Sequence, residues 1–387
     1  MLLGAGGAYG YVQWRFGEIR HVAVFGLGRV GHSAQSRNDG SSIPPFTLLA
    51  IGSDTRNLGA GASAAFGSAS AVGGQRSDSI ILVRVVPRTR SLALLSIPRD
   101  TLVPIPGYGT TRINTAFNSG NPGLLVTVLQ KDFGIDVNHV VEFNFDTFEQ
   151  VADAVGGVEQ WFPTPAKDDF SLLNVPAGCV KLTGAQALGF VRSREYQYFL
   201  NGAWHYQYYP ESDLARIQRQ QAFARDLVKK AKTKFGPTSV FELNNVIGSV
   251  TRNLTLDKSF SNSLLLSLAT DYRSANLSAI PSYTYPAVNS TSVPGALDPR
   301  LEPGRAVIQE WLHAGRPAPR AQAASPAVTS GATGTAVSGA GPTTTTTVAG
   351  PAYAGTQTVD PASSSIYHGV YIPPGLVPGQ TPQTCGE

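Results

Sequence analysis

The 387-residue sequence lacks several features that would each define a class of protein. It has only two cysteines, Cys179 and Cys385, and their distance in the sequence fits no metal-ligand spacing. It has no Lys-rich run and a net charge of only +4, so nucleic acid is not the expected partner. No Ser, His or Cys stands in a nucleophile sequence such as Gly-x-Ser-x-Gly, which argues against acyl transfer.

A long hydrophobic run is also missing. The first residues, MLLGAGGAYGYVQWRFGEIRHV, are apolar for about a dozen positions, whereas a membrane span takes roughly 20. They lack the charged start and the cleavage site of a signal peptide. We interpret residues 1–22 as a truncated or residual membrane anchor, with Tyr11, Trp14 and Arg15 at the membrane interface. An ordinary surface helix is the alternative.

Two short runs, residues 79–86 and 92–97, form the clearest pattern in the chain. Both are β-branched or aliphatic and too short for helices, and the turn at residues 87–90 separates them. They predict a hairpin whose apolar surface is buried.

Charged residues flank this hairpin. Arg76 and Asp78 precede the first strand, Arg99 and Asp100 follow the second, and Arg112 lies just beyond. A buried sheet with charges at its rim is a common frame for a site. Each residue taken singly is better explained as a solvated strand end, but the cluster favours a site because later segments supply matching groups.

Strands and helices alternate along the rest of the chain. This alternation indicates an α/β or α+β sandwich with the sheet inside. Strands are expected at 46–52 and 137–143, helices at 123–133, 145–155, 183–188 and 305–313, more helical segments between 241 and 272, and short strands between 277 and 299.

A longer helix is predicted from Ser212 and Asp213 onward, with the sequence DLARIQRQQAFARDLVKKAK. Arg216 and Gln220 lie one turn apart on a common face, close to Arg219. An ordinary solvated amphipathic helix with an acidic N-cap is the alternative.

The C-terminal part changes composition. Residues 317–365 are Ala, Thr, Pro, Gly and Ser, so they cannot bury enough surface to fold and are expected to be a disordered linker. Residues 366–387 regain apolar side chains and form a tail that is a candidate for docking. In an extracytoplasmic protein Cys179 and Cys385 could form one disulfide that ties this tail back, and two unpaired thiols are the alternative.

Arginine dominates the cationic residues. Of 30 basic residues, 22 are Arg and 8 are Lys. Arginine binds phosphate in two-point geometry. Several arginines with a few carboxylates suit a polyanionic substrate, because guanidinium groups can hold a diphosphate while two Asp carboxylates keep Mg²⁺ against its oxygens.

Six short motifs occur in an order that resembles the LytR-CpsA-Psr family, over roughly Phe46 to Lys232. Each motif alone is weak, but six in order are specific. They are G-S-D-T-R at 52–56, R-S-D-S-I at 76–80, S-I-P-R-D at 96–100, R-I-N at 112–114, F-V-R-S-R at 190–194 and D-L-A-R-I-Q-R-Q-Q at 213–221.

The resemblance implies an extracytoplasmic enzyme, anchored to the cell membrane by its N-terminal segment. Its catalytic domain, residues 23–316, would be of the α/β class, an α-β-α sandwich with a central mixed β-sheet. The enzyme would transfer a glycopolymer phosphate from a polyprenyl-pyrophosphate carrier to peptidoglycan, with Mg²⁺. By motif, Asp54 and Asp78 would be metal carboxylates, Asp78, Arg99, Arg192 and Arg194 catalytic, and Arg56, Arg76, Arg112, Arg216, Arg219 and Gln220 pyrophosphate-binding.

The sequence leaves three questions open. The general base is not evident, and Asp213 and Asp78 are both candidates. The apolar interior is either a tunnel for the polyprenyl chain or an ordinary filled core. A non-catalytic binding protein for the carrier or the cell wall, and a lipid pyrophosphatase, are alternatives to the transferase. The aromatic stretch between Arg194 and Asp213 departs from the family pattern and bears on glycan or lipid access.

Overall fold

The computed structural model describes residues 19–28, 43–53, 77–117, 122–207, 211–234, 254–272, 275, 280–314 and 385. All of them belong to one unit, formed by residues 1–316 and 365–387. The second unit, residues 317–364, lies outside the described residues. The predicted linker, residues 317–365, is therefore outside the described residues. The same holds for nearly all of the predicted anchor and the predicted tail. No helix in the described part of the chain has the length and hydropathy to span a bilayer.

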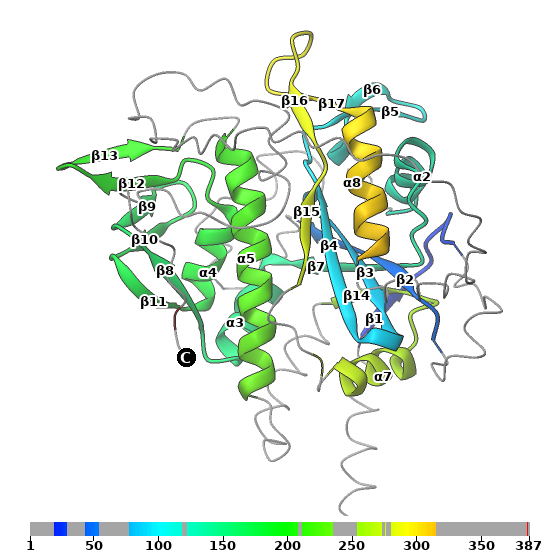
Figure 1. Ribbon diagram of the computed structural model, residues 1–387, viewed down its shortest axis with the longest axis horizontal. Helices are drawn as coiled ribbons and strands as arrows, with labels where there is room; N and C mark the ends of the chain where they lie inside the picture. Colours follow the sequence, from blue (N-terminus) through cyan, green and yellow to red (C-terminus); the bar gives the residue numbers. More distant parts are fainter. Residues whose placement is uncertain are drawn as a thin grey trace, which may run out of the picture. The chain divides into compact units, whose positions relative to one another are not determined.

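A seven-stranded mixed sheet forms the centre of this unit (Figure 1). The predicted hairpin is confirmed: β3 and β4 pair antiparallel and are joined by the 3-10 helix η4, Pro87–Thr89. β2 pairs antiparallel with β3 and parallel with β7, so both predicted neighbouring strands are confirmed as well. In spatial order the strands are β1 (Arg20–Val22), β14 (Leu254–Asp257), β7 (His139–Asn144), β2 (Phe46–Ser53), β3 (Ser77–Val86), β4 (Ser91–Ile97) and β15 (Ser282–Thr284).

Helices cover both faces of this sheet. The first face packs against α2 (Pro122–Phe133), the 3-10 helix η5 (Ile113–Phe117) and α8 (Leu301–His313) in one apolar core. In that core the buried Trp311 donates from Nε1 to the carbonyl oxygen of Ala93, 3.0 Å away. On the opposite face α7 (Asn262–Tyr272) packs on Phe46, Val85 and Leu256. The α-β-α sandwich is therefore confirmed.

Two segments differ from the sequence-based prediction. β14 is a strand inside the region predicted to be helical, because Leu254–Asp257 pairs with β7 and β1. Four residues carry too little periodicity to show this. α8 begins at Leu301, four residues before the predicted start, because Pro303 is tolerated in a first turn whose N–H groups have no helical acceptor.

The strand ends meet at one edge of the sheet. The register pairs Ser53 at the end of β2 with Ser77 at the start of β3, and Ile97 at the end of β4 with Ile80. β7 ends beside Ser53, at Asn144. The chain segments that follow β2 and β4 and precede β3 therefore leave from the same edge.

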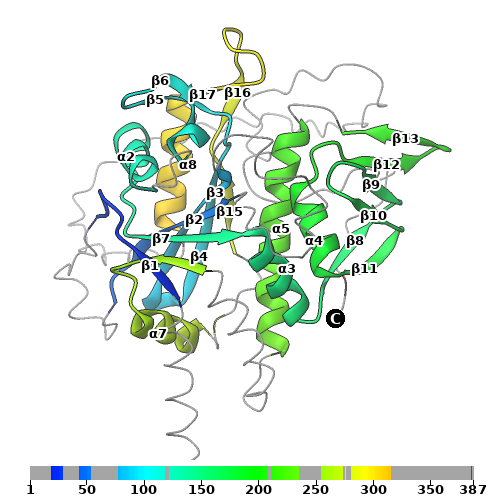
Figure 2. The same cartoon turned by 180° about the vertical axis from the view of Figure 1, so that it is seen from behind.

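The helix α5 (Glu211–Lys234) lies between this sheet and a group of smaller elements, as Figures 1 and 2 show from opposite sides. Gln221 Nε2 donates to Ser96 Oγ and to the carbonyl oxygen of Tyr283, both at 2.9 Å, and so fixes α5 to β4 and β15. On its other side Phe223 enters a second core. The smaller elements are α3 (Phe145–Ala154), α4 (Gly184–Arg192), the pair β8 (Val158–Phe162) and β11 (Gly178–Leu182), and the sheet β10 (Leu173–Val175), β9 (Ala166–Asp168), β12 (Gln197–Leu200) and β13 (Ala203–Tyr206).

The structure extends the prediction in this second region. α4 starts after a capping box at Thr183 but runs on to Arg192, four residues beyond its predicted end. The aromatic stretch after it is a hairpin of β12 and β13. Asn201 and Gly202 form its turn with φ values of 51° and 81°, the left-handed pair that a tight hairpin uses.

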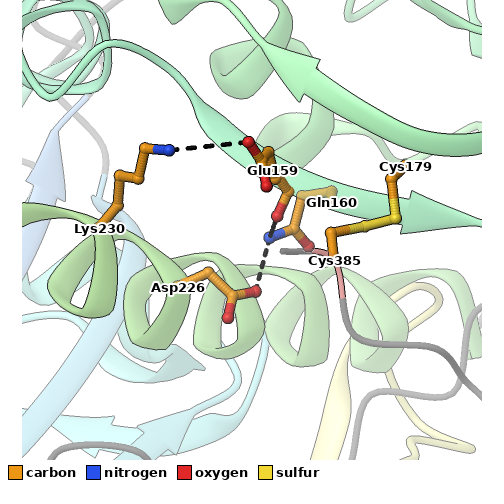
Figure 3. The surroundings of a disulfide bond; sticks show 6 residues. All are labelled: Glu159, Gln160, Cys179, Asp226, Lys230 and Cys385. Carbon is orange, nitrogen blue, oxygen red and sulfur yellow. Dashed lines mark hydrogen bonds and ion pairs between the residues drawn. A yellow bond between two sulfur atoms is a disulfide. The ribbon is translucent and has the colours of Figure 1, made fainter. Parts of the chain in front are cut away.

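The two cysteines are joined. Cys179 of β11 and Cys385 form a disulfide whose Cα atoms are 5.6 Å apart, so the pairing that the sequence left open is present (Figure 3). Beside it, Gln160 Nε2 of β8 donates to Asp226 Oδ2 of α5 at 2.6 Å. Lys230 Nζ of α5 forms an ion pair with Glu159 Oε1 of β8 at 3.7 Å. The β8–β11 pair is thus fixed to α5 as well as to the C-terminal segment.

The disulfide and the predicted linker together give a proteolysis prediction. Elastase cuts after small residues in segments that bury little apolar surface, so it should cut first within residues 317–365. The C-terminal fragment should stay attached on a non-reducing gel and separate only after reduction. A Cys385→Ser variant should release the fragment under both conditions. Release from the unaltered chain without reductant would contradict the pairing.

Candidate functional site

A cavity of about 430 Å³ lies at the edge of the sheet where β4 ends. Three of the predicted site arginines, Arg99, Arg112 and Arg194, line it. They come from separate parts of the chain: the turn after β4, the end of β6 (Gly109–Arg112) and the segment after α4. The remaining lining residues are Asp100, Asn114, Thr115 and Gly295.

The backbone around Arg99 and Asp100 is held by a bond within its own turn and by two neighbouring segments. Thr101 N donates to the carbonyl oxygen of Pro98 at 3.1 Å, which closes the turn after β4. The amide of Asn114 donates to the Arg99 carbonyl at 3.1 Å, and the amide of Leu297 donates to the Asp100 carbonyl at 2.9 Å. Asn114 belongs to η5, which follows the hairpin of β5 (Leu102–Ile105) and β6. Leu297 is the first residue of β17 (Leu297–Pro299), which pairs with β16 (Ala287–Asn289).

Asp100 sits between two of the cavity arginines. Its two carboxylate oxygens lie 3.5 Å from Nε of Arg99 and 3.5 Å from Nε of Arg112. Arg112 also donates from Nη2 to the carbonyl oxygen of Pro294 at 2.9 Å. The Asp100 side chain is only 10% exposed, so this arrangement is partly shielded from water. Three guanidinium groups against one carboxylate leave the cavity net positive, which suits a polyanion.

Arg194 is positioned by a buried carboxylate that the sequence analysis did not single out. Asp168 of β9 is fully buried and accepts five hydrogen bonds. Its Oδ2 accepts from Ser193 Oγ at 2.6 Å and from the amides of Arg194 and Glu195 at 2.9 Å. The segment that carries Arg194 is therefore fixed to the second core through its backbone.

The same hydrogen bonds set the ionisation of Asp168. Burial by itself would raise the pKa of this carboxyl. The hydrogen bonds from the Ser193 hydroxyl and from the amides of Ser171, Glu195 and Phe170 stabilise the charged form more strongly, and the pKa lies below its ordinary value of 3.8. Asp168 is thus a buried anion at neutral pH.

The predicted residues on α5 are buried rather than solvated. Arg216 and Arg219 are 3% and 0% exposed, so the alternative of an ordinary solvated helix is wrong at these positions. Arg219 donates from Nη2 to the Ser193 carbonyl at 2.6 Å and from Nη1 to Gln207 Oε1 at 2.9 Å, with its guanidinium 4.8 Å from the centre of the Tyr196 ring.

Gln220 has a similar local role. Its Nε2 donates to the carbonyl oxygen of Val191 at 3.1 Å. Arg219 and Gln220 thus bind the backbone on both sides of Arg192, the last residue of α4. Arg192 is not among the residues that line the cavity.

Five further candidate residues lie wholly or partly outside the described part of the chain. Asp54, Arg56 and Arg76 lie outside the described residues. Asp78 lies in β3 and Asp213 in the first turn of α5, but their side chains are outside the described part. The backbone register pairs Ser53 of β2 with Ser77 of β3. These two residues directly precede Asp54 and Asp78 in the sequence.

The described residues contain no group of three or more His, Cys, Asp or Glu side chains that could hold a metal ion. Among them Asp100 is the carboxylate that lines the cavity, and Asn114, which has a side-chain amide oxygen, also lines it. Such oxygen donors fit Mg²⁺, which commonly takes one or two carboxylates and completes its shell with substrate phosphate and water. The assignment to Asp54 and Asp78 stays a prediction.

Known proteins resemble this chain over most of its described part. The model of the LytR_cpsA_psr family matches residues 29–297. The probable cell wall biosynthesis protein LcpB of Corynebacterium glutamicum is 34% identical over 208 residues, 52% of this chain and 47% of that protein. The polyisoprenyl-teichoic acid–peptidoglycan teichoic acid transferase TagU of Bacillus cereus is 31% identical over 222 residues, 57% of this chain and 64% of that protein. The chain thus spans about half to two thirds of these curated relatives.

A solved structure agrees on the fold. The LytR-Csp2A-Psr enzyme from Actinomyces oris superposes with a TM-score of 0.56 at 22% identity, over 77% of this chain and 97% of that one. At this identity the likeness concerns the fold alone.

The role of Asp168 gives a stability prediction. Asp168→Asn places an amide among five donors, and the unfolding free energy should fall by about 3 kcal/mol at pH 7. Because the pKa of Asp168 is lowered on folding, its contribution is complete above the ordinary value of 3.8 and is lost as the pH falls through the lower folded value. The difference from the unaltered chain should therefore shrink below pH 4.

The measurement is thermal unfolding between pH 3 and 7. The neighbouring Asp169→Asn is the matched control, since that side chain is 75% exposed and should change the melting temperature little. Equal effects of the two substitutions would contradict the assigned role of Asp168.

Proposed function

The chain belongs to the LytR-CpsA-Psr family, and on that premise we propose that it transfers a glycopolymer with its linking phosphate from a polyprenyl-pyrophosphate carrier to peptidoglycan. One observation carries the proposal: three guanidinium groups from three separate segments converge with one carboxylate on a single cavity. A diphosphate is the group in this reaction that needs such an excess of positive charge. The relative TagU is named for a reaction of the same class.

The proposed reaction is a displacement at phosphorus. A hydroxyl oxygen of peptidoglycan forms a bond to the phosphorus that carries the glycopolymer, and the bridging P–O bond of the diphosphate breaks. Polyprenyl phosphate leaves with the bridging oxygen, and the hydroxyl proton passes to a base, for which Asp78 and Asp213 stay the candidates. The protein's main tasks in such a transfer are positioning and charge neutralisation.

The residues of the cavity divide these tasks. Arg99 is held by Asp100 and by the backbone of the turn after β4, so its guanidinium is oriented before the substrate arrives. Arg194 lines the cavity from the side of the second core, because its backbone amide is hydrogen-bonded to Asp168. Two sides of a diphosphate can thus be contacted from two separately folded regions.

Magnesium is part of the proposal. Asp100, together with the predicted ligands Asp54 and Asp78, offers the hard oxygen donors that Mg²⁺ prefers. When bound, the ion would neutralise charge on the diphosphate oxygens. We further propose that the protein acts at the extracytoplasmic face of the cell membrane, held by its N-terminal segment. The Cys179–Cys385 disulfide supports this location, because such bonds persist in oxidising compartments.

The central test is the transfer activity of an Arg99→Ala variant. Purified protein is incubated with a short polyprenyl-pyrophosphate glycan, Mg²⁺ and peptidoglycan fragments, and the linked product is quantified. Loss of one oriented charge donor should lower the rate about 10²–10³-fold. Arg99→Lys should recover part of it, because lysine keeps the charge but not the two-point geometry. The control is Arg88→Ala, an exposed residue at the opposite end of the same hairpin.

The same assay separates the alternatives. Carrier binding without turnover would indicate a binding protein, and release of polyprenyl phosphate without an acceptor would indicate a pyrophosphatase. Either outcome would replace the transferase proposal.

Metal removal gives a further prediction. Treatment with EDTA should abolish transfer, and excess Mg²⁺ should restore it, because the diphosphate charge is then neutralised again. Asp78→Asn should raise the Mg²⁺ concentration needed for half-maximal activity. Full activity after exhaustive chelation would rule out the metal part of the proposal.

A further inference from the structure

The sheet β10-β9-β12-β13 has one face that does not belong to the second core. Ala166, Asp168 and Leu173 point into the core and are buried. Since side chains alternate along a strand, Lys167 of β9 and Asn174 of β10 point to the opposite face. The register continues this outer face onto the hairpin, where its members are Gln197, Phe199, Trp204 and Tyr206.

Three aromatic side chains of this outer face are open to solvent. Phe199, Trp204 and Tyr206 are 37%, 40% and 44% exposed. Trp204 and Tyr206 are two residues apart on β13 and share a face, which puts their Cα atoms about 7 Å apart. Exposed aromatic side chains grouped in this way usually mark a binding surface.

The rings are held in place before any ligand binds. Phe199 meets Trp204 edge-on with ring centres 5.4 Å apart, and Lys167 Nζ lies 5.1 Å from the centre of the Trp204 ring. The base of the hairpin is closed by the bond from the Gln207 amide to the Tyr196 carbonyl, at 2.9 Å, and is fixed to α5 through Arg219 and Gln207. A fixed aromatic surface loses little entropy on binding.

The near-neutral charge of this outer face favours a neutral ligand over a polyanion. Lys167 is paired with Asp169 at 3.6 Å, so the outer face carries no excess charge comparable to that of the cavity. A phosphate-rich polymer would find its counter-charges at Arg99, Arg112 and Arg194 instead. Flat aromatic rings beside the polar side chains of Asn174 and Lys167 suit the apolar faces and amide groups of neutral N-acetylated sugars.

We propose that this outer face binds the glycan strand of the peptidoglycan acceptor, with sugar rings stacked on Trp204 and Tyr206. The inference rests on the proposed transferase function and deepens it by assigning an acceptor subsite. The hairpin that carries this face starts close to the cavity in the sequence: β12 begins at the buried Gln197, three residues after Arg194 of the cavity. Asp168 and Arg219 fix the segment between them. An acceptor strand on this face lies next to the segment that carries a diphosphate-binding side chain.

The first experiment measures binding without catalysis. The full chain is titrated calorimetrically with the tetramer of N-acetylglucosamine, and in a second arm with poly(glycerol phosphate). The tetramer should bind, and Trp204→Ala and Tyr206→Ala should each weaken it about 10-fold, with Trp204→Phe recovering part of the loss. Phe25→Ala, an exposed aromatic elsewhere in the chain, is the control and should bind normally. Unchanged melting temperatures would show that the variants are folded.

The second experiment measures transfer. Trp204→Ala should raise KM for peptidoglycan fragments about 10-fold and leave kcat and the KM for the lipid donor unchanged. Active transfer with an unchanged acceptor KM would overturn the acceptor subsite and leave the transferase proposal intact. Tetramer binding that depends on Trp204, without any transfer, would reject the transferase and keep the sugar site. Binding of poly(glycerol phosphate) to this face instead of the tetramer would overturn the assigned ligand.

Discussion

The buried carboxylate of Asp168 is the interaction on which the site geometry depends. It gathers the Ser193 hydroxyl and the amides of Arg194 and Glu195, and hydrogen bonds to a charged group contribute about 1.5–3 kcal/mol each. Arg219 adds a bond to the Ser193 carbonyl from the other side. A short segment between α4 and β12 is thereby fixed from two sides. Because Arg194 belongs to that segment, the carboxylate decides where one wall of the cavity lies.

The helix α5 fixes the position of Asp168 and its hydrogen-bond partners relative to the main sheet. Gln221 contacts β4 and β15, and Arg225 donates to Ser282 Oγ at 2.8 Å, whereas Phe223 packs against Phe148 in the second core. One helix therefore connects the two cores and keeps a fixed spacing between the turn after β4 and the segment after α4. The long arginine side chains can then meet around one anion although their backbones belong to different cores. The outer face of the small sheet is held by the same connections.

The family motifs and the structure agree in part, and for identifiable reasons. Arg99, Arg112 and Arg194 were expected in one site from their motifs, and they line one cavity. Arg219 and Gln220 come from the same set, yet their described contacts are with protein carbonyls and with Gln207. A sequence motif shows which residue types occur together. It does not show whether a given side chain binds the substrate or holds a neighbouring loop in place. Asp168 stands in no motif, so the sequence carried no signal of its role.

The central hairpin, the helices α2 and α3, the family and all three arginines that line the cavity could be predicted from the sequence, because they depend on local periodicity and short ordered motifs. The hairpin of β12 and β13 has a local signal in its Asn201-Gly202 turn, which the sequence-based prediction did not use. Only the tertiary structure made Leu254–Asp257 a strand. It also decided that Arg216 and Arg219 are buried. These outcomes depend on partners more than ten residues away, and the free energy of such pairing and burial is not encoded in any local pattern.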